Sequence, residues 1–263
     1  MENTRSGEYV MKIGFIGVGE LTEKLIRGLM NINKNRQFYL SPRSRKRVSV
    51  LSEMEGCTVM RSNQAVIDQA DIVIIGIRPE ALTELADEVQ LRPDQTVISL
   101  LAGTSSNVLQ TTFSPAKPVR LMMTYSAEIN KTTVVLSDCS DAIKVLFSDL
   151  GEVITTSDDT SFELATVGMC MNGWLYSFAA QLQGWFTEKG MSTEQSRTLV
   201  LSSFRECAEY AAYRCDCSLG ELAKSIATPG TYTALGQEEL DKLQAAEPWI
   251  NAADSVLSAL VKK

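Results

Sequence analysis

A glycine-rich segment near the amino terminus carries the clearest chemical signal in the sequence. Residues 12–22 place Gly17 and Gly19 between a short apolar run and an amphipathic stretch, as in a strand, a turn and a helix. The first glycine of such a turn permits its tight bend, and the second lets a pyrophosphate approach the backbone where the helix dipole is positive. Thr22 occupies the third small position of the motif. This spacing predicts a dinucleotide-binding turn.

A cluster of hydroxyls and cations follows the second predicted strand, in the segment 41–47. NAD-dependent enzymes keep an acidic residue here for the ribose hydroxyls, whereas hydroxyl and guanidinium groups match the 2′-phosphate of NADP. We therefore predict NADPH as the cofactor, with its 2′-phosphate bound by Ser41, Arg43, Ser44 and Arg45. The alternative is the solvated start of a basic helix, although cations there oppose the helix dipole unless an anion offsets them.

The residues that are missing restrict the reaction. Reduction of a ketone needs an acid for the alkoxide, and dehydrogenases supply it from histidine, a Tyr/Lys pair or zinc. The chain has no histidine, no Tyr-x-x-x-Lys spacing, and no Lys or Arg between Lys144 and Lys189. A protonated imine already carries its positive charge, so its reduction requires no acid from the protein. The sequence therefore favours reduction of a C=N bond.

A second polar turn lies near the carboxyl terminus, at Thr228-Pro-Gly-Thr-Tyr-Thr233. It precedes a predicted helix over residues 233–245, so its hydroxyls and backbone N–H groups are suited to a substrate carboxylate. A plain helix cap explains the same residues equally well.

These candidate residues need a framework, and the apolar pattern predicts an α/β fold. Five short apolar runs, at 12–16, 37–40, 71–75, 96–100 and 118–122, alternate with stretches of helical spacing. Repeated strand and helix units imply a parallel sheet covered on both faces. Two further strands, at 132–136 and 152–155, flank a helix over 143–150. We predict an N-terminal Rossmann-type domain that binds NADPH, spanning residues 1–157.

The second part of the chain, residues 158–263, has a different pattern. Its helix-like stretches cover 162–188, 193–213, 219–226 and 233–245, and no β-branched run interrupts them. We predict an all-helical domain here, with the polar segment 157–160 as the boundary.

Composition limits the partners and the compartment. A net charge of −7 disfavours binding to a phosphate backbone, so we expect no nucleic-acid partner. No apolar run approaches the roughly 18 residues that a membrane span needs, so we expect no membrane segment. The polar first nine residues lack the apolar stretch of a secretory signal, and we expect a cytoplasmic protein.

The cysteines give no support for a metal site. There is no CxxC spacing, and without histidine the usual ligand sets cannot form, so we predict no metal. We interpret the cysteines as buried thiols, while Cys215 and Cys217, two residues apart, leave chelation or pairing with a partner chain as an alternative. The six are Cys57, Cys139, Cys170, Cys207, Cys215 and Cys217.

Several short motifs together resemble one enzyme family nearly end to end. They are Gly14-Phe-Ile-Gly-Val-Gly-Glu-Leu21, Asn63 ahead of Ala70-Asp-Ile-Val73, Ile77-Arg-Pro79, Ser99-Leu-Leu-Ala-Gly103, Arg120-Leu-Met122 and Thr228-Pro-Gly-Thr-Tyr-Thr233. On these motifs the chain resembles the pyrroline-5-carboxylate reductase family, which reduces a cyclic imino acid to proline with NAD(P)H.

The resemblance implies roles for individual residues. The first four motifs would line the cofactor through Gly17, Gly19, Glu20, Leu21, Asn63, Ile77, Arg78, Pro79, Ala102 and Gly103. The last motif would bind the substrate carboxylate through Thr228, Gly230, Thr231, Tyr232 and Thr233. Thr233 stands at the position proposed to hydrogen-bond the ring nitrogen, and it is the predicted catalytic residue. The helical domain of the family interlocks between two chains, so we expect a homodimer or a higher homo-oligomer.

Departures from the family pattern leave three hypotheses open. The family's Met-Pro-Asn-Thr-Pro is Met122-Met-Thr-Tyr-Ser126 here, and its Ser-Gly-Ser-Gly-Pro-Ala-Tyr is Cys170-Met-Asn-Gly-Trp-Leu-Tyr176. The first hypothesis is an NADPH-dependent imino-acid reductase, with pyrroline-5-carboxylate as first candidate. The second is a related reductase of a different C=N or C=O substrate. The third is a non-catalytic NADPH-binding regulatory protein.

Overall fold

A computed structural model describes residues 10–32 and 36–262. The polar amino-terminal segment discussed above, residues 1–9, lies outside the described residues. The chain divides into two compact units, Met1–Met169 with Leu257–Lys263, and Cys170–Val256. No helix in the described ranges is both long and apolar enough to cross a membrane.

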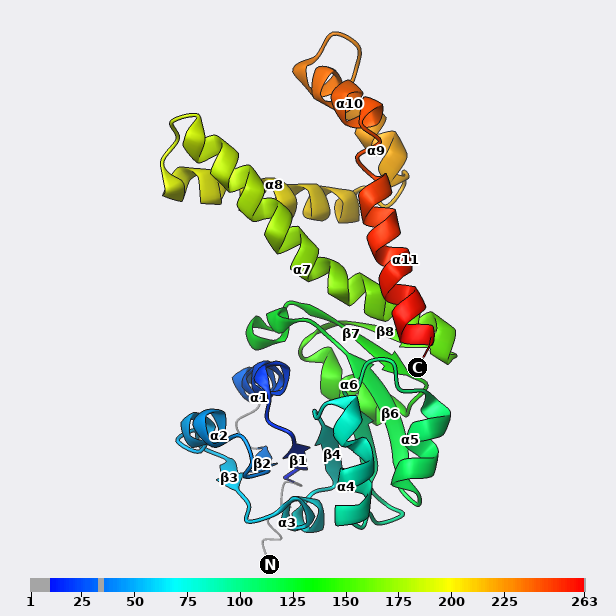
Figure 1. Ribbon diagram of the computed structural model, residues 1–263. Coiled ribbons are helices and arrows are strands. Elements are labelled where there is room, and N and C mark those ends of the chain that lie inside the picture. The colour runs from blue at the N-terminus through cyan, green and yellow to red at the C-terminus, as the bar shows by residue number, and fades with distance from the viewer. Residues whose placement is uncertain (1–9, 33–35, 263) are drawn as a thin grey trace, which may run out of the picture. The chain divides into compact units, whose positions relative to one another are not determined.

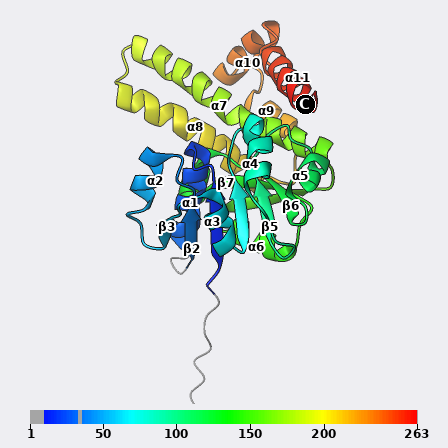
Figure 2. The ribbon, with the colours of Figure 1, turned by 60° about the horizontal axis from the view of Figure 1, so that its bottom comes forward.

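The first unit is built on a sheet in which the structure describes eight strands (Figures 1 and 2). Their order is β3-β2-β1-β4-β5-β6-β7-β8. The first six are parallel, whereas β7 is antiparallel to β6, and β8 runs parallel to β7. The strands are β1 (Lys12–Ile16), β2 (Gln37–Leu40), β3 (Cys57–Val59), β4 (Ile72–Ile75), β5 (Thr96–Ser99), β6 (Lys117–Met122), β7 (Thr132–Ser137) and β8 (Gly151–Thr156).

Helices cover both faces of this sheet, because alternate strand residues point to opposite sides. Ile13 and Phe15 of β1 join one apolar cluster with helices α1, α2 and α6, and Val73 and Ile75 of β4 join another with α3, α4 and α5. Every residue of β4 is buried, as expected for a central parallel strand. The helical elements are α1 (Glu20–Ile32), α2 (Arg45–Leu51), α3 (Asn63–Gln69), η1 (Pro79–Ala81), α4 (Leu82–Glu88), α5 (Ser106–Phe113), η2 (Tyr125–Ile129) and α6 (Asp141–Ser148).

The predicted strands are confirmed, with ends that shift by one residue at most. The sequence missed β3, which has only three residues, all of them at least partly exposed, and therefore lacks an apolar pattern. The expectation of parallel pairing fails at β7. Only residues 123–131 connect β6 to β7, which is too short for the crossover that parallel neighbours need.

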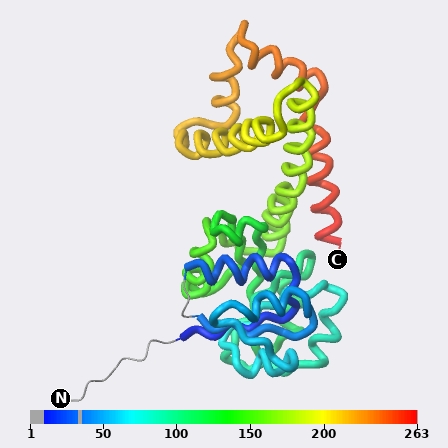
Figure 3. The backbone as a smooth tube through the Cα atoms, turned by 90° about the vertical axis from the view of Figure 1, so that its left-hand side faces the viewer, coloured from blue at the N-terminus to red at the C-terminus, as the bar shows by residue number. Residues whose placement is uncertain are grey.

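The helices of the second part are α7 (Asp159–Glu188), α8 (Thr193–Tyr213), α9 (Leu219–Ile226), α10 (Tyr232–Lys242) and α11 (Glu247–Val261). Capping boxes begin α8, with Ser192 and Gln195, and α9, with Ser218 and Glu221, which explains why these two match the prediction. Helix α11 was not predicted. The first turns of α7 and the last turn of α11 lie side by side within the first unit (Figure 3), where Thr160 and Val261 line a common cavity.

The division of the chain into 1–157 and 158–263 stays a prediction. Strand β8 ends and α7 begins within two residues of that boundary, but the first compact unit continues to Met169. Within Cys170–Val256, three of the described residues are buried: Ser196, Val200 and Leu222. Trp249 of α11 contacts Trp174 and Phe178 of α7 edge-on.

The interpretation of the six cysteines as buried thiols is wrong. Cys170, Cys207 and Cys215 are exposed, and the other three are only partly buried. Burial raises the pKa of the Cys57 thiol to about 11, so this group stays protonated at neutral pH.

Candidate functional site

The glycine-rich turn between β1 and α1 is fixed by contacts with three other segments. Gly17 has φ of +83°, and a Cβ there would lie 2.7 Å from the carbonyl oxygen of Gly76. Its N–H donates to the Ser41 hydroxyl at 3.0 Å, and its carbonyl accepts from the Thr22 hydroxyl at 3.0 Å. The turn therefore depends on the ends of β2 and β4 as much as on its own sequence.

Unlike Gly17, Gly19 is not required to be glycine by contacts within the protein or by its backbone conformation. A Cβ at this position would meet no atom within 4 Å, and its φ lies outside the left-handed region. Because Gly19 immediately precedes α1, the open space lies at the positive end of that helix. This is the arrangement expected where a ligand phosphate approaches the backbone.

The bulk of Thr22 at the third motif position is accommodated by a glycine at the end of another strand. Its side chain is 1% exposed, and a Cβ on Gly76 would come within 2.2 Å of its hydroxyl oxygen. The larger residue on α1 is thus accommodated by a glycine at the end of β4. The sequence analysis missed this pairing because 54 positions separate the two residues.

A groove of about 500 Å³ opens beside Gly19 and continues along the first turn of α2. It brings together three predicted cofactor residues, Gly19, Ser44 and Arg45, with Lys46, which the prediction omitted. The Ser44 side chain makes no capping hydrogen bond, and in the described ranges no acidic side chain pairs with Arg45 or Lys46. The groove therefore has hydroxyl and cationic groups available for an anion.

Arg47, the next cation of α2, is neutralised within the protein. It donates to Glu23 at 2.7 Å and lies 3.5 Å from Glu20, both on α1. Burial opposes ionisation of Glu23, but hydrogen bonds from Arg47 and Arg27 outweigh burial and hold the pKa of this carboxyl below its usual range. These ion pairs fix the first turn of α1 against α2 on the wall of the groove.

Two residues predicted to bind the 2′-phosphate point elsewhere. Ser41 is 1% exposed, and its hydroxyl accepts from Gly17. Arg43 donates to Glu84 at 3.0 Å and to Glu88 at 3.3 Å, both on α4. Asn63 is also buried and donates to Glu88 at 2.9 Å. In this structure Ser41 bonds the glycine-rich turn, and Arg43 and Asn63 bond α4, so their contacts with a cofactor stay predictions.

The remaining predicted cofactor residues lie at the same edge of the sheet. Glu20 and Leu21 open α1, and Ala102 with Gly103 follows β5. Ile77, Arg78 and Pro79 follow β4, and Pro79 begins η1. Because β1, β4 and β5 are parallel, all of these positions are at carboxyl ends of strands, where nucleotides bind in open α/β sheets.

The predicted substrate loop lies in the second unit and has a regular local structure. Residues 228–231 form a turn closed by the Thr231 N–H donating to the Thr228 carbonyl at 3.1 Å, with Gly230 at φ +84°. The Thr231 hydroxyl accepts from the Ala234 N–H and so caps α10. Tyr232 is 93% exposed. Thr231 therefore fills the helix-cap role, while carboxylate binding and the role of Thr233 stay predictions.

Comparisons with known proteins agree with this fold. The family described as "NADP oxidoreductase coenzyme F420-dependent" matches residues 12–103. Pyrroline-5-carboxylate reductase 2 of Bacillus subtilis (strain 168) is 24% identical over 257 residues, covering 92% of this chain and 91% of that protein.

Two solved structures extend the agreement to the whole chain. The crystal structure of 1-pyrroline-5-carboxylate reductase from Streptococcus pyogenes has a TM-score of 0.86 at 24% identity and covers 97% of this chain and 99% of that one. Pyrroline carboxylate reductase of Plasmodium falciparum, solved with NADP bound, has a TM-score of 0.84 at 20% identity and covers 96% and 97%. These matches confirm the predicted α/β fold with a helical second part.

Proposed function

We propose that the chain is a divergent member of the pyrroline-5-carboxylate reductase family, which it resembles over 92% of its length, and that it is an NADPH-dependent reductase of a C=N bond. Pyrroline-5-carboxylate, reduced to proline, is the first candidate substrate. The observation that carries the proposal is the groove beside Gly19, where an open backbone approach and the groups of Ser44, Arg45 and Lys46 suit a phosphorylated dinucleotide. NADP in the Plasmodium falciparum relative supports the choice of cofactor.

The groups of this chain divide between the two reactants. The adenosine 2′-phosphate is bound by Arg45 and Ser44, with Lys46 beside them, and the pyrophosphate lies at Gly19. NADPH supplies the hydride. The loop Thr228–Thr233 binds the substrate carboxylate, and the Thr233 hydroxyl hydrogen-bonds the ring nitrogen. Since the protonated imine becomes a neutral amine on hydride transfer, no further acid is required.

A second copy of the chain completes the helical unit. Large apolar side chains lie exposed along its helices, including Tyr176 at 64%, Leu240 at 52% and Ile250 at 53%. Three buried described residues cannot stabilise a unit of this size, because stability requires burial of apolar surface. The assembly is therefore a homodimer or a higher homo-oligomer, which sedimentation velocity measures directly. A monomer at micromolar concentration would contradict it.

The compartment is the cytoplasm. In the part of the chain that the structure describes, all six cysteines are free thiols. Free thiols are typical of a reducing environment.

The direct test is oxidation of NADPH in the presence of pyrroline-5-carboxylate, followed by absorbance at 340 nm. Titration calorimetry with NADPH and NADH separates cofactor binding from turnover. We expect binding of NADPH, preference over NADH, and proline as the product. Absence of heat with both coenzymes would refute the proposal as a whole.

A different substrate is the second candidate, and one feature favours it. Where the family has an asparagine between prolines, this chain has a hydroxyl cluster: the Thr124 hydroxyl oxygen lies 2.6 Å from that of Ser126 and 3.1 Å from that of Thr132. A panel of cyclic and linear imines and ketones separates the alternatives. Turnover of another substrate with none of pyrroline-5-carboxylate favours the related reductase, and tight NADPH binding without oxidation favours a regulatory protein.

A further inference from the structure

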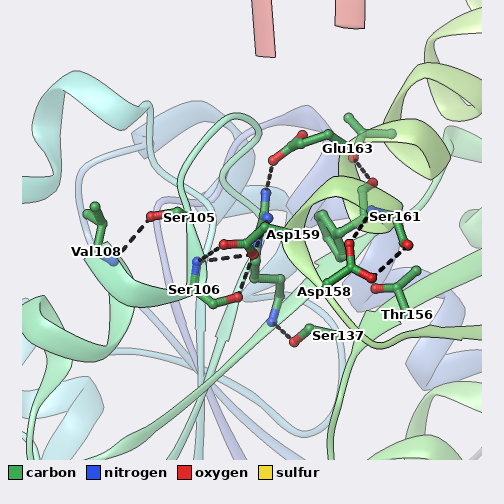
Figure 4. A network of polar contacts seen from close by, with 12 residues as sticks. Ser105, Ser106, Val108, Ser137, Thr156, Asp158, Asp159, Ser161 and Glu163 are labelled. Atoms are coloured by element: carbon green, nitrogen blue, oxygen red, sulfur yellow. Dashed lines mark hydrogen bonds and ion pairs between the residues drawn. The ribbon is translucent and has the colours of Figure 1, made fainter. Parts of the chain in front are cut away.

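Arg120 on β6 is a buried charge that pairs with two carboxylates, while its Nε has no hydrogen-bonding partner among the described residues. It is 1% exposed, and its guanidinium carbon lies 4.0 Å from the centroid of the Phe162 ring. Its Nη1 donates to Asp159 at 2.8 Å, and its Nη2 donates to Glu163. Both carboxylates come from the first turns of α7 (Figure 4). A buried charge is stable only when it is paired and hydrogen-bonded, so this arrangement is strongly specified.

Asp159 extends this network to a third element, α5. Its Oδ2 accepts from the Ser106 N–H at 3.0 Å, and its Oδ1 accepts from the Ser106 hydroxyl at 2.6 Å (Figure 4). Ser106 is the first residue of α5, so a carboxylate from α7 binds an N–H that the helix itself leaves unpaired. Burial opposes ionisation of Asp159, but hydrogen bonds from Ser106 and Arg120 outweigh it and hold the pKa of this carboxyl below its usual range.

The position of Ser106 matters because of the segment that precedes it. Residues 100–105 connect the end of β5 to α5 and contain Ala102 and Gly103, which we predict to line the cofactor. At the β5 end, the Leu101 N–H donates to the Ser99 hydroxyl at 3.3 Å, and Gly103 has φ of +64°. Asp159 thus fixes the far end of a six-residue connection.

The strand order assigns this connection to one half of the cofactor. The groove for the adenosine end lies beside β1 and β2, and β4 and β5 lie on the other side of β1. A dinucleotide that crosses the sheet edge between β1 and β4 therefore brings its nicotinamide half toward the ends of β4 and β5. The connection after β5 is on the nicotinamide side.

We propose that Asp159 is a positioning residue for the nicotinamide half of NADPH. Held by Arg120, it fixes the amino terminus of α5 and with it the Ala102–Gly103 turn against which that half of the cofactor lies. Glu163 is the weaker candidate, because in the described residues Arg120 is its one hydrogen-bonding partner, and its second oxygen has none. The inference rests on the proposed function and adds to it the residue that orients the reacting ring.

Two variants test the link from opposite ends. Asp159→Asn removes the charge, and Ser106→Pro removes the N–H and the hydroxyl through which Ser106 donates to Asp159, while the bond from Arg120 stays in place. Proline suits the first position of a helix, and the Ser105 backbone, at φ −67° and ψ 156°, is compatible with a following proline. The matched control is Asp149→Asn, which breaks the ion pair with the buried Arg36 at 2.8 Å elsewhere in the same unit.

Calorimetry compares the affinity for NADPH with the affinity for 2′,5′-ADP, which contains only the adenosine half of the cofactor. We expect both variants to bind NADPH roughly 10-fold more weakly and to lower kcat by a similar factor, since small errors in position slow hydride transfer. Their affinity for 2′,5′-ADP, which lacks the nicotinamide, stays within about twofold of the wild type. The control lowers Tm without changing either affinity.

Each outcome decides the matter. An unchanged ratio of NADPH to 2′,5′-ADP affinity in Ser106→Pro, whatever happens to Tm, overturns the positioning role while the proposed function stands. That outcome includes equal weakening of both ligands, which is the effect of a general structural loss. A wild-type chain that binds neither ligand defeats the proposed function, and this inference with it.

Discussion

The two turns assigned to the two reactants differ in what holds their shape. The Gly17–Gly19 turn depends on distant residues, through Ser41 and through the contact of Thr22 with Gly76. The Thr228–Thr233 turn is held by Thr231, whose partners Thr228 and Ala234 are three residues away on either side. One turn belongs to the core of the sheet, and the other is a local cap on an exposed helix.

This difference predicts how substitutions act. A change in the first turn reaches the ends of β2 and β4, so it alters stability as well as binding. In the second turn the structural role falls on the cap residue Thr231, so a change at Thr233 should leave the folded unit almost unaffected and isolate an effect on chemistry. The comparison is wrong if substitutions in the two turns change the stability of the fold by the same amount.

The largest effect is expected at Gly17. Replacement by Ala puts a Cβ 2.7 Å from the carbonyl oxygen of Gly76 at a φ of +83°, so we expect Gly17→Ala to lose about 3 kcal/mol of unfolding free energy. Urea unfolding measures it. Gly19→Ala is the matched control, with a loss below about 1 kcal/mol, because its Cβ meets no atom. Equal losses would show that the two glycines serve the same purpose.

Gly19 should instead be decisive for binding. In Gly19→Val the side chain occupies the space through which the pyrophosphate approaches, so we expect NADPH affinity to fall roughly 100-fold, or about 2.7 kcal/mol. The fold should persist, since the space is otherwise empty. Calorimetry gives the affinity and circular dichroism the fold. Unchanged affinity would place the phosphates away from this turn.

Arg45 and Arg43 form a matched pair at the adenosine end. Arg45 lines the groove, whereas Arg43 is paired with Glu84 and Glu88. We expect Arg45→Ala to weaken NADPH by roughly 1–3 kcal/mol while NADH is spared, because only NADPH carries the 2′-phosphate. Arg43→Ala should change NADPH affinity less than about threefold, as for an exposed ion pair. A larger loss of NADPH affinity in Arg43→Ala than in Arg45→Ala would indicate that Arg43 binds the 2′-phosphate.

Much of the first turn could be predicted from sequence because the signal is local. Residues 12–22 contain the strand, the two glycines and the helix start, and β1 and α1 follow the prediction. The partners of Ser41 and Arg43 could not be predicted, because they are distant in the sequence. Ser41 accepts from Gly17, 24 residues away, and Arg43 donates to Glu84, 41 residues away. The same hydroxyl or guanidinium serves a ligand or a neighbouring loop, and only tertiary structure decides which.

In the helical unit the secondary structure could be predicted from sequence, but the burial of side chains could not. Helices α8 and α9 could be predicted because capping boxes mark where they begin. The expectation of buried cysteines failed because Cys170, Cys207 and Cys215 lie on a unit with few buried residues. Burial depends on tertiary packing, which no local pattern of the sequence encodes.

Thr233 tests the local turn. We expect Thr233→Ala to lower kcat/KM for the imino acid roughly 10-fold, the loss of one hydrogen bond, with NADPH affinity unchanged. Thr231→Ala is the comparison: it removes a predicted contact with the substrate carboxylate and also the cap of α10, so it should lower kcat/KM and cost about 1 kcal/mol of stability as well. Steady-state kinetics and thermal unfolding separate the two. If the rate of Thr233→Ala holds, the hydroxyl has no part in the reaction.

The smallest effect concerns Glu23, which ties α1 to α2 at the wall of the groove. Its folded-state pKa lies below the ordinary value of 4.5, so the ionised carboxyl stabilises the folded chain above that pH. This contribution disappears as pH falls through the folded pKa, because protonation then breaks the bonds from Arg47 and Arg27. Glu23→Gln should therefore be less stable than the wild type at pH 7, by less than about 1 kcal/mol, and the difference should shrink as the pH falls below 4.5 and through the folded-state pKa of Glu23. Asp141→Asn, which changes a 94% exposed carboxyl, controls for the loss of a charge. A difference that grows with acid would mean that the ion pairs with α2 do not stabilise the fold, and the wall of the groove would then depend on apolar packing alone.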